Sequence, residues 1–193
     1  RRVLFRCYYF KSRKKRGVVE IKQGWLTGVK HVPSPNYDNR PEGEIPSLLI
    51  IHNISLPPGQ FGGPYIDQLF TNTLAVDDHP FFNEIAHLRV SAHCLIRRDG
   101  EIVQYVPFTA RAWHAGVSFY KGREKCNDFS IGIELEGTDE CDFTPQQYQQ
   151  LLALTQQLIE HYPEIKENIT GHSDVAPGRK TDPGPHFNWS YYR

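Results

Sequence analysis

The sequence predicts a single mixed α/β domain, in which a central mixed β-sheet is flanked by α-helices. The chain has 193 residues, 39% of them hydrophobic, and this size suits one ordinary globular domain. Strand-like segments alternate along the chain with segments of helical periodicity, and two of the strands read as a hairpin. Interleaved strands and helices, combined with one antiparallel hairpin, are typical of a mixed sheet with helices packed on it.

Three segments carry the strand predictions. The sequence SLLIIH at 47–52 is an apolar run that ends at a polar residue, as expected of a buried strand. The sequence SIGIEL at 130–135 reads as a second buried strand. Residues 92–106 read as a hairpin, because apolar residues alternate around Asp99-Gly100, a dipeptide that suits a tight turn with positive φ.

The clearest helix is predicted over residues 145–162. Thr144 can cap it, Pro145 suits the first helical position, and Gln147 completes a capping-box pattern. Apolar and aromatic residues recur behind this start at helical spacing, which predicts that one face packs on the sheet. The members of this stripe are Tyr148, Leu151, Leu152, Thr155, Leu158, Ile159 and Tyr162.

Three further segments complete the outline of the domain. Residues 65–70 have the apolar spacing of a short helix. Residues 31–47 are rich in turn formers and are predicted to be an extended surface loop. Residues 171–184 are polar and rich in Gly and Pro, and a loop of that kind after a helix and a short strand can carry a functional site.

Residues 1–18 are predicted to form a basic arm. Residues 1–16 hold eight Lys or Arg and no acidic residue, whereas the rest of the chain holds 14 basic and 22 acidic residues, a net charge of −8. Such an arm can bind nucleic acid or anionic lipid. We expect instead that residues 1–18 are disordered or not native and that residues 19–193 form the domain. The alternative is that the arm packs on the domain through its apolar and aromatic residues. We therefore expect no nucleic-acid, membrane or obligate protein partner.

The cysteines and the start of the chain bear on the compartment. Cys7, Cys94, Cys126 and Cys141 include no C-x-x-C pair, so neither a zinc finger nor a redox motif is indicated. An odd, scattered set of three in the domain favours free thiols in a reducing compartment. Arg6 interrupts the only early apolar stretch, so no secretory signal peptide is indicated. These features predict a cytoplasmic protein.

Two histidines and one carboxylate form the first candidate site. His52 closes the predicted strand at 47–52, while His172 and Asp182 share the polar loop at 171–184. Catalytic zinc takes three protein ligands, imidazole nitrogen and carboxylate oxygen among them, and keeps a further position open for water. The residue types fit that pattern, but a long-range ligand set has no fixed spacing, so an unrelated polar loop remains the alternative.

Long motifs give the chain a family resemblance. The stretches SLLIIHNISLPPGQFGGPYIDQLF, HLRVSAHCLIRRDGEIVQYVPF, RAWHAGVSFYKGREKCNDFSIGIELEGTD and TGHSDVAPGRKTDPGP resemble the zinc-dependent N-acetylmuramoyl-L-alanine amidases. The same wider family includes peptidoglycan recognition proteins and the lysozyme of phage T7. The resemblance runs from about Gly24 to the last residue, so it covers most of the chain and leaves out the basic arm.

The resemblance implies a set of catalytic residues. It implies one zinc ion per chain, bound by His52, His172 and Asp182. It implies Glu134 as the catalytic acid and base and Lys180 as a group that stabilises the transition state. Many members of the wider family have Cys as the third ligand, and Asp182 in this chain matches the branch that acts on 1,6-anhydro-muramoyl peptides.

Four more residues are expected to contact the substrate. Asn53 and Arg89 resemble substrate-binding positions of the family, and Arg89 suits a peptide carboxylate. Trp113 and His114 are expected to border the cleft, since Trp offers a flat apolar face to a sugar. For His114 the alternative is that it orients the site by hydrogen bonding. His93 is expected to be a core residue, and the remaining histidines are expected to be structural.

The expected reaction is hydrolysis of the amide bond between the lactyl group of 1,6-anhydro-N-acetylmuramic acid and L-alanine in small muropeptides. Its expected setting is cytoplasmic cell-wall recycling, with an indirect link to β-lactamase regulation. Two alternatives stay open. One is a broader amidase that acts on intact peptidoglycan, and the other is a muropeptide-binding module without catalysis.

Overall fold

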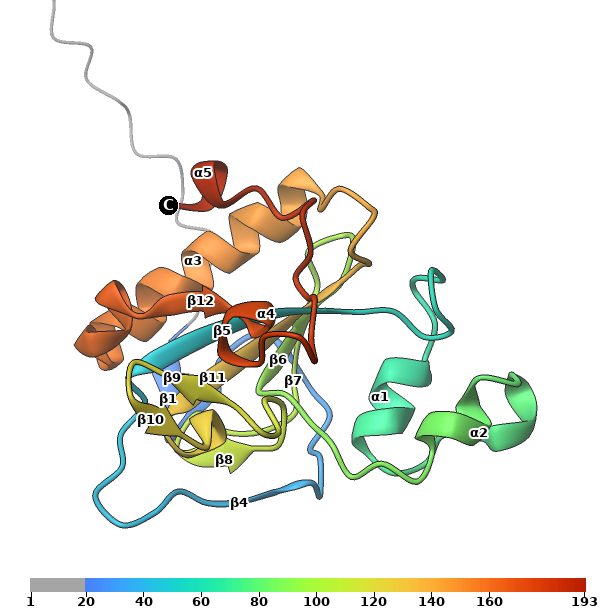
Figure 1. Ribbon diagram of the computed structural model, residues 1–193, viewed down its shortest axis with the longest axis horizontal. Coiled ribbons are helices and arrows are strands. Elements are labelled where there is room, and N and C mark those ends of the chain that lie inside the picture. The colour runs from blue at the N-terminus through green and yellow to red at the C-terminus, as the bar shows by residue number, and fades with distance from the viewer. Residues whose placement is uncertain (1–19) are drawn as a thin grey trace, which may run out of the picture.

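The computed structural model describes residues 20–193, and its centre is a six-stranded mixed sheet with the strand order β12-β5-β11-β6-β7-β3 (Figure 1). The strands β12, β5, β11 and β6 run parallel, β6 and β7 form the antiparallel hairpin, and β3 pairs parallel with β7. The bounds are β3 (Lys30–His31), β5 (Leu48–Ile54), β6 (Cys94–Ile96), β7 (Ile102–Gln104), β11 (Ser130–Glu136) and β12 (Ile169–Gly171).

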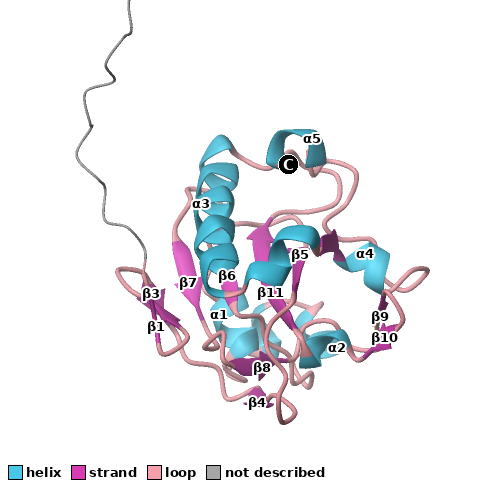
Figure 2. Cartoon of the chain, turned by 90° about the vertical axis from the view of Figure 1, so that its left-hand side faces the viewer, coloured by secondary structure: helices cyan, strands magenta, loops and turns pink. Residues whose placement is uncertain are grey.

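Helix α3 (Pro145–His161) covers one face of the sheet (Figure 2). Its buried residues, among them Leu151, Leu154 and Leu158, share one core cluster with alternate residues of the central strands, such as Ile51 and Ile133. Because side chains alternate across a strand, the intervening residues of β5 and β11 must face the other way. That opposite face carries His52 of β5 and Glu134 of β11.

The opposite face is covered by two smaller groups of elements. Helices α1 (Tyr65–Phe70) and α2 (Phe82–Ile85) build a second core cluster with β6, β7 and β8 (Ala110–Ala112), and they project to one side in Figure 1. A third cluster joins β5 to the 3₁₀ turn η2 (Cys126–Asp128) and to α4 (His172–Val175).

Short elements complete the described chain. They are β1 (Ile21–Lys22), β2 (Trp25–Leu26), β4 (Tyr37–Asn39), β9 (Phe119–Tyr120), β10 (Arg123–Glu124), α5 (Trp189–Tyr192) and the 3₁₀ turns η1 (Val76–Asp78) and η3 (Pro163–Glu167). None of the helices within residues 20–193 has the length and apolarity needed to cross a membrane.

The expected elements are largely confirmed. The fold is the predicted mixed α/β domain, both long strands are present, and the hairpin turns at Asp99-Gly100. Helix α3 begins with the predicted capping box: Thr144 Oγ1 accepts from the Gln147 amide at 3.1 Å, and Gln147 Oε1 accepts from the Thr144 amide at 3.0 Å. The basic arm expected at residues 1–18 lies outside the described residues.

Two details of the prediction are wrong. Residues 31–47 are more than a surface loop, because β4 pairs with β8 and the side chain of Asn36 is buried, where it donates to the carbonyl oxygen of Val90 at 2.8 Å. In α3 the buried face includes Leu154, which the predicted stripe omits, whereas Leu152 and Ile159 lie at its edge and are only partly buried.

Candidate metal centre and active site

The site lies on the face of the sheet opposite α3, where β5 and β11 approach their carboxyl ends. His52 of β5 and Glu134 of β11 are direct partners in the parallel register. Both follow the alternation of their strands: Ile51 and Ile133 point into the core under α3, so His52 and Glu134 point away from it. His172 is the first residue after β12, which pairs with the other edge of β5. Three adjacent parallel strands therefore deliver three polar side chains to one place.

His52, His172 and Asp182 form a compact triangle of donor atoms. Nδ1 of His52, Nδ1 of His172 and Oδ2 of Asp182 each lie 3.0 Å from the other two. An ion with tetrahedral bonds of about 2.0–2.1 Å holds its ligands roughly 3.3–3.4 Å apart, so the triangle is within a few tenths of an ångström of that spacing. Among the described residues, this is the one group of three that could hold a metal ion.

The surroundings of the triangle favour a bound cation. The two histidines are buried and Asp182 is half-buried. Nε2 of His172 lies 3.1 Å from the carbonyl oxygen of Ala115, which can only accept, so the lone pair of His172 is left on Nδ1 inside the triangle. The Nδ1 lone pair of His172 and the buried carboxylate of Asp182 lie close together, and a cation between them would stabilise both.

The pKa values of two residues of the triangle lie below their usual range. Burial lowers the pKa of His52 to about 4, so its imidazole is neutral and able to bind a metal at physiological pH. Burial raises the pKa of Asp182, but the hydrogen bonds of this carboxylate with His172 and His52 outweigh that effect and leave its pKa below the usual value. Both shifts keep the donors in the protonation states that metal binding requires.

Glu134 stands beside the triangle with one free oxygen. Its Oε1 lies 4.0 Å from Nδ1 of His52, and its Oε2 is buried without a hydrogen-bond partner in the described part of the chain. Burial raises the pKa of Glu134 well above its usual value, and the negative charge of Asp182 adds to the effect. A buried carboxylate with a raised pKa, next to a candidate metal site, is suited to accept and return a proton.

The segment that carries Lys180 and Asp182 is held against α4 by a backbone hydrogen bond and packs on the last residue of β12. The Ser173 amide donates to the carbonyl oxygen of Asp182 at 2.9 Å. A Cβ atom at Gly171 would lie 2.7 Å from Cδ of Pro183, so the segment packs on a bare glycine. Lys180 is exposed, and its positive charge acts on both His52 and Glu134. The lysine therefore lies at the open side of the site.

Three of the residues expected to bind substrate, Asn53, Arg89 and Trp113, have different surroundings. Asn53 follows His52 in β5, and its Nδ2 donates to Oδ1 of Asp139 at 2.7 Å. Arg89 is exposed, and its guanidinium contacts only nearby carbonyl oxygens, those of Ala86 and His87. The indole N–H of Trp113 donates to Asp38 at 3.1 Å. Within residues 20–193, no hydrogen bond or ion pair links these three side chains to the metal triangle.

His114 lies directly behind His52. Its Nδ1 is 2.9 Å from Nε2 of His52, and its Nε2 is 3.3 Å from Oγ of Ser130. Burial lowers the pKa of His114 well below its usual value. A Cβ atom at Gly132 would lie 2.5 Å from Cγ of His114, so the ring occupies the space that this glycine leaves open. His93 is a core residue as expected: it is fully buried, and its Nδ1 accepts from the Gly132 amide at 3.0 Å.

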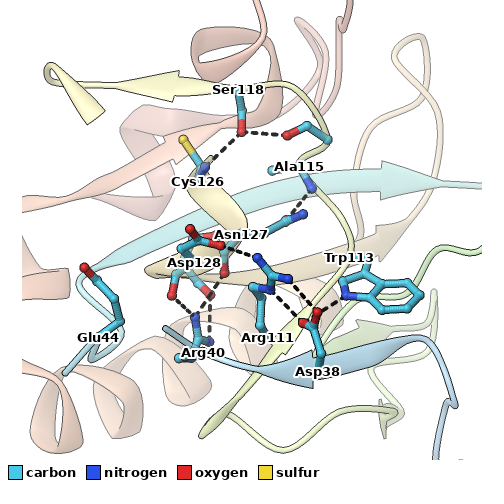
Figure 3. Close-up of polar contacts among 12 residues, drawn as sticks. Asp38, Arg40, Glu44, Arg111, Trp113, Ala115, Ser118, Cys126, Asn127 and Asp128 are labelled. Carbon is cyan, nitrogen blue, oxygen red and sulfur yellow. Dashed lines mark hydrogen bonds and ion pairs between the residues drawn. The ribbon is translucent and has the colours of Figure 1, made fainter. Parts of the chain in front are cut away.

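A polar network that the sequence reasoning missed supports this part of the site (Figure 3). The guanidinium of Arg111 forms ion pairs with the carboxylates of Asp38 and Asp128, each with an N···O distance of 2.5 Å. The indole N–H of Trp113 also donates a hydrogen bond to Asp38. Oδ1 of Asn127 accepts from the backbone amides of His114 at 3.2 Å and Ala115 at 2.8 Å. These partners are far apart along the chain or lie in loops, and no local sequence pattern marks them.

Comparison with known proteins identifies the family of the chain. The family model described as N-acetylmuramoyl-L-alanine amidase matches residues 42–185. The 1,6-anhydro-N-acetylmuramyl-L-alanine amidase AmpD of Escherichia coli (strain K12) is 69% identical over 173 residues, which are 90% of this chain and 94% of that protein.

Solved structures agree in the same way. A crystal structure of an AmpD selenomethionine derivative has a TM-score of 0.88 at 67% identity and covers 90% of this chain and 97% of its own. The amidase AmiD from E. coli, solved with the substrate anhydro-N-acetylmuramic acid-L-Ala-D-γ-Glu-L-Lys, has a TM-score of 0.56 at 28% identity and covers 91% of this chain and 64% of its own. The fold, the site and the extent of these matches together make the chain a member of the N-acetylmuramoyl-L-alanine amidase family.

Proposed function

We propose that this chain is a zinc-dependent amidase that cleaves 1,6-anhydro-N-acetylmuramoyl peptides between the lactyl group and L-alanine. The observation that carries the proposal is the triangle of His52, His172 and Asp182 with the unpartnered oxygen of Glu134 beside it. The substrate is proposed by analogy with the AmpD relatives, whose names state it. The products are the anhydro sugar with a free lactyl carboxylate and the free peptide.

His52, His172 and Asp182 would hold one zinc ion per chain. Two imidazole nitrogens and one carboxylate oxygen are the ligand types of an open catalytic zinc site. Bound zinc supplies Lewis-acid polarisation and makes water acidic enough to lose a proton near neutral pH.

Glu134 would transfer the proton, and Lys180 would stabilise the negative charge that develops on the substrate. Oε2 of Glu134, which has no partner in the described chain, takes a proton from the attacking water and passes it to the leaving nitrogen of L-alanine. Lys180, at the open side of the site, places its ammonium group beside the carbonyl oxygen as negative charge develops there.

Asn53, Arg89 and Trp113 are proposed to contact the substrate. Asp139 holds the Nδ2 group of Asn53, which leaves the amide oxygen of Asn53 as the acceptor for a substrate N–H. The exposed guanidinium of Arg89 suits a peptide carboxylate, and the ring of Trp113 suits a sugar face. For His114 the contact with His52 favours the alternative role, in which it orients the site.

Muropeptide recycling in the cytoplasm is the proposed setting. The three cysteines of the described residues, Cys94, Cys126 and Cys141, are free thiols, which supports a reducing compartment. A small muropeptide is the proposed partner.

One experiment tests the proposal and both alternatives. The purified protein is incubated with anhydro-muramyl tripeptide and with the reducing-end muropeptide, with and without a chelator, and the products are identified by mass. We expect cleavage of the anhydro substrate that stops on chelation and returns with added zinc. Equal cleavage of both substrates would favour the broader amidase, and binding without cleavage would favour the binding module.

A further inference from the structure

Two consecutive residues, His114 and Ala115, contact both imidazole ligands of the candidate metal centre. The side chain of His114 meets His52, with 2.9 Å between Nδ1 of His114 and Nε2 of His52. The carbonyl oxygen of Ala115 meets His172, at 3.1 Å from its Nε2. Neither His114 nor Ala115 belongs to the triangle, so their effect on a metal passes through its ligands.

The contact with Ala115 fixes the tautomer of His172. A carbonyl oxygen has no proton, so Nε2 of His172 must donate to it. The lone pair of a neutral His172 is then on Nδ1, the atom that faces His52 and Asp182. A second interaction of this kind commonly fixes the ring orientation and tautomer of a metal-binding histidine.

The contact with His114 has the same consequence for His52. Nδ1 of His52 faces the triangle, so a metal ion there requires the proton of His52 to be on Nε2. That proton then points at Nδ1 of His114, which must accept it. Acceptance leaves the proton of His114 on its own Nε2, where Oγ of Ser130 lies 3.3 Å away and can accept in turn. The opposite arrangement, with His114 donating, would place the proton of His52 inside the metal site.

Asn127 and Gly132 hold the pair in position. Oδ1 of Asn127 accepts from the backbone amides of both His114 and Ala115, and Figure 3 shows it beside Ala115. Gly132 of β11 leaves room for the ring of His114 against the sheet. The carbonyl oxygen of Ala115 also accepts from Nη2 of Arg179 at 2.6 Å. Asn127, Gly132 and Arg179 therefore all contribute to where the two supporting groups lie.

We propose that His114 and Ala115, held by Asn127, are positioning residues that set the tautomers of His52 and His172 for metal binding. The proposal rests on the proposed zinc site and adds the groups that orient its ligands. Outer partners of this kind typically contribute about 10–100-fold to metal affinity. His114→Phe keeps a ring but removes the acceptor, and Asn127→Ala removes the acceptor of the two amides, so each should weaken zinc binding by roughly that factor.

The test measures the zinc dissociation constant of the full chain by competition with a chelating dye. His114→Asn and Asn127→Asp are the conservative variants, because each places an oxygen acceptor near the original acceptor atom, which is a ring nitrogen in His114 and an amide oxygen in Asn127. We expect both to stay within a few-fold of the wild type. His87→Phe, at an exposed histidine, is the matched control and should bind zinc like the wild type. Melting temperatures of all variants identify any that fail to fold.

Nitrogen-15 NMR of histidine-labelled, zinc-loaded protein gives a second measurement, independent of activity. We expect the proton of His52 on Nε2, with a coupling across the hydrogen bond to Nδ1 of His114. A wild type that binds no zinc would refute the proposed zinc site itself. A wild type that binds zinc while His114→Phe and Asn127→Ala bind equally well would refute only the positioning role. A proton found on Nδ1 of His114, or His114→Asn as weak as His114→Phe, would also overturn that role.

Discussion

Glu134 and His52 are paired residue to residue in the parallel register of β11 and β5, and their side chains leave the sheet on the same face with 4.0 Å between Oε1 and Nδ1. The proposed base and a proposed metal ligand are thus positioned by the hydrogen bonds of two central strands rather than by a loop. A site whose residues lie on central strands is held more rigidly than a site on loops. Substitution of one residue is therefore expected to leave the positions of the others unchanged.

The metal triangle gives the first prediction. His52→Ala and Asp182→Ala should each lose stoichiometric zinc and nearly all amidase activity, because each removes one of three donor atoms. Metal analysis of the purified variants and product formation from anhydro-muramyl tripeptide are the measurements. His186→Ala is the control, since His186 is exposed and pairs with Asp142 away from the triangle. Turnover that persists in fully demetallated wild type would contradict the assignment.

Glu134 should be separable from metal binding. Glu134→Gln is expected to retain zinc but to lose about 10²–10⁴-fold in kcat, the usual effect of removing a general acid or base. Lys180→Ala should likewise retain zinc and lose turnover. Single-turnover assays at saturating substrate, with zinc content measured on the same samples, check both. Near-normal kcat in either variant would remove that residue from the mechanism.

The same glutamate should make the zinc-free protein less stable at neutral pH. Burial raises the pKa of Glu134 in the folded state, so the folded protein holds this proton to higher pH than the unfolded chain does. The stability that the proton provides is present at acid pH and is lost as the pH rises above about 4.5 towards the folded-state pKa. Glu134→Gln should therefore gain stability relative to wild type as the pH rises from 4 to 8. Denaturant titrations measure this, with the exposed Glu140→Gln as control.

Gly132 should tolerate no side chain. A Cβ atom there would lie 2.5 Å from Cγ of His114, inside β11, so Gly132→Ala must displace the imidazole or the strand. Overpacking of this kind costs about 1–3 kcal/mol in the free energy of unfolding. Gly63→Ala is the matched control, because its Cβ would meet nothing closer than 3.4 Å. Urea unfolding of both variants decides, and equal stabilities would show that the ring of His114 is free to move.

His93 should contribute to acid denaturation. Burial lowers its pKa to about 3, whereas in the unfolded chain it is about 6.5. The unfolded state therefore binds the extra proton between these values, and stability falls as the pH drops from about 6.5 to 3. His93→Asn keeps an acceptor for the Gly132 amide but cannot titrate, so the slope of unfolding free energy against pH should fall by up to about 1.4 kcal/mol per pH unit. Zinc-free protein is used, and an unchanged slope would contradict the assignment.

Much of the fold could be predicted from local sequence patterns. The capping box at Thr144, the apolar run of β5 and the turn at Asp99-Gly100 each specify a local conformation, and each is found in the structure. The segment SIGIEL indicates more than a buried strand. Ile131 and Ile133 alternate with smaller or polar residues, which already distinguishes a core face from a site face.

The supporting residues could not be predicted in this way. Asn127 lies in a 3₁₀ turn and Asp139 in the loop after β11, and both act through long-range contacts that only the packed sheet creates. Leu154 is more deeply buried than Leu152. Which of the two is buried depends on the angle of α3 against the sheet, and helical periodicity alone does not set that angle. Local patterns therefore predict the elements, and the family resemblance supplies the candidate site residues, but neither gives the partners that orient them.

The pairing of β12 with β5 has a consequence for how the protein matures. His172 and Asp182 are separated from His52 by 120 and 130 residues of chain, and the three donors meet only after β11 and β12 have taken their places beside β5. Closing loops of this length costs conformational entropy and slows folding. On the ribosome, His172 and Asp182 are also synthesised long after His52. Of the three proposed donors, a growing chain therefore carries only His52 at first, and the proposed metal site can form only in the finished sheet.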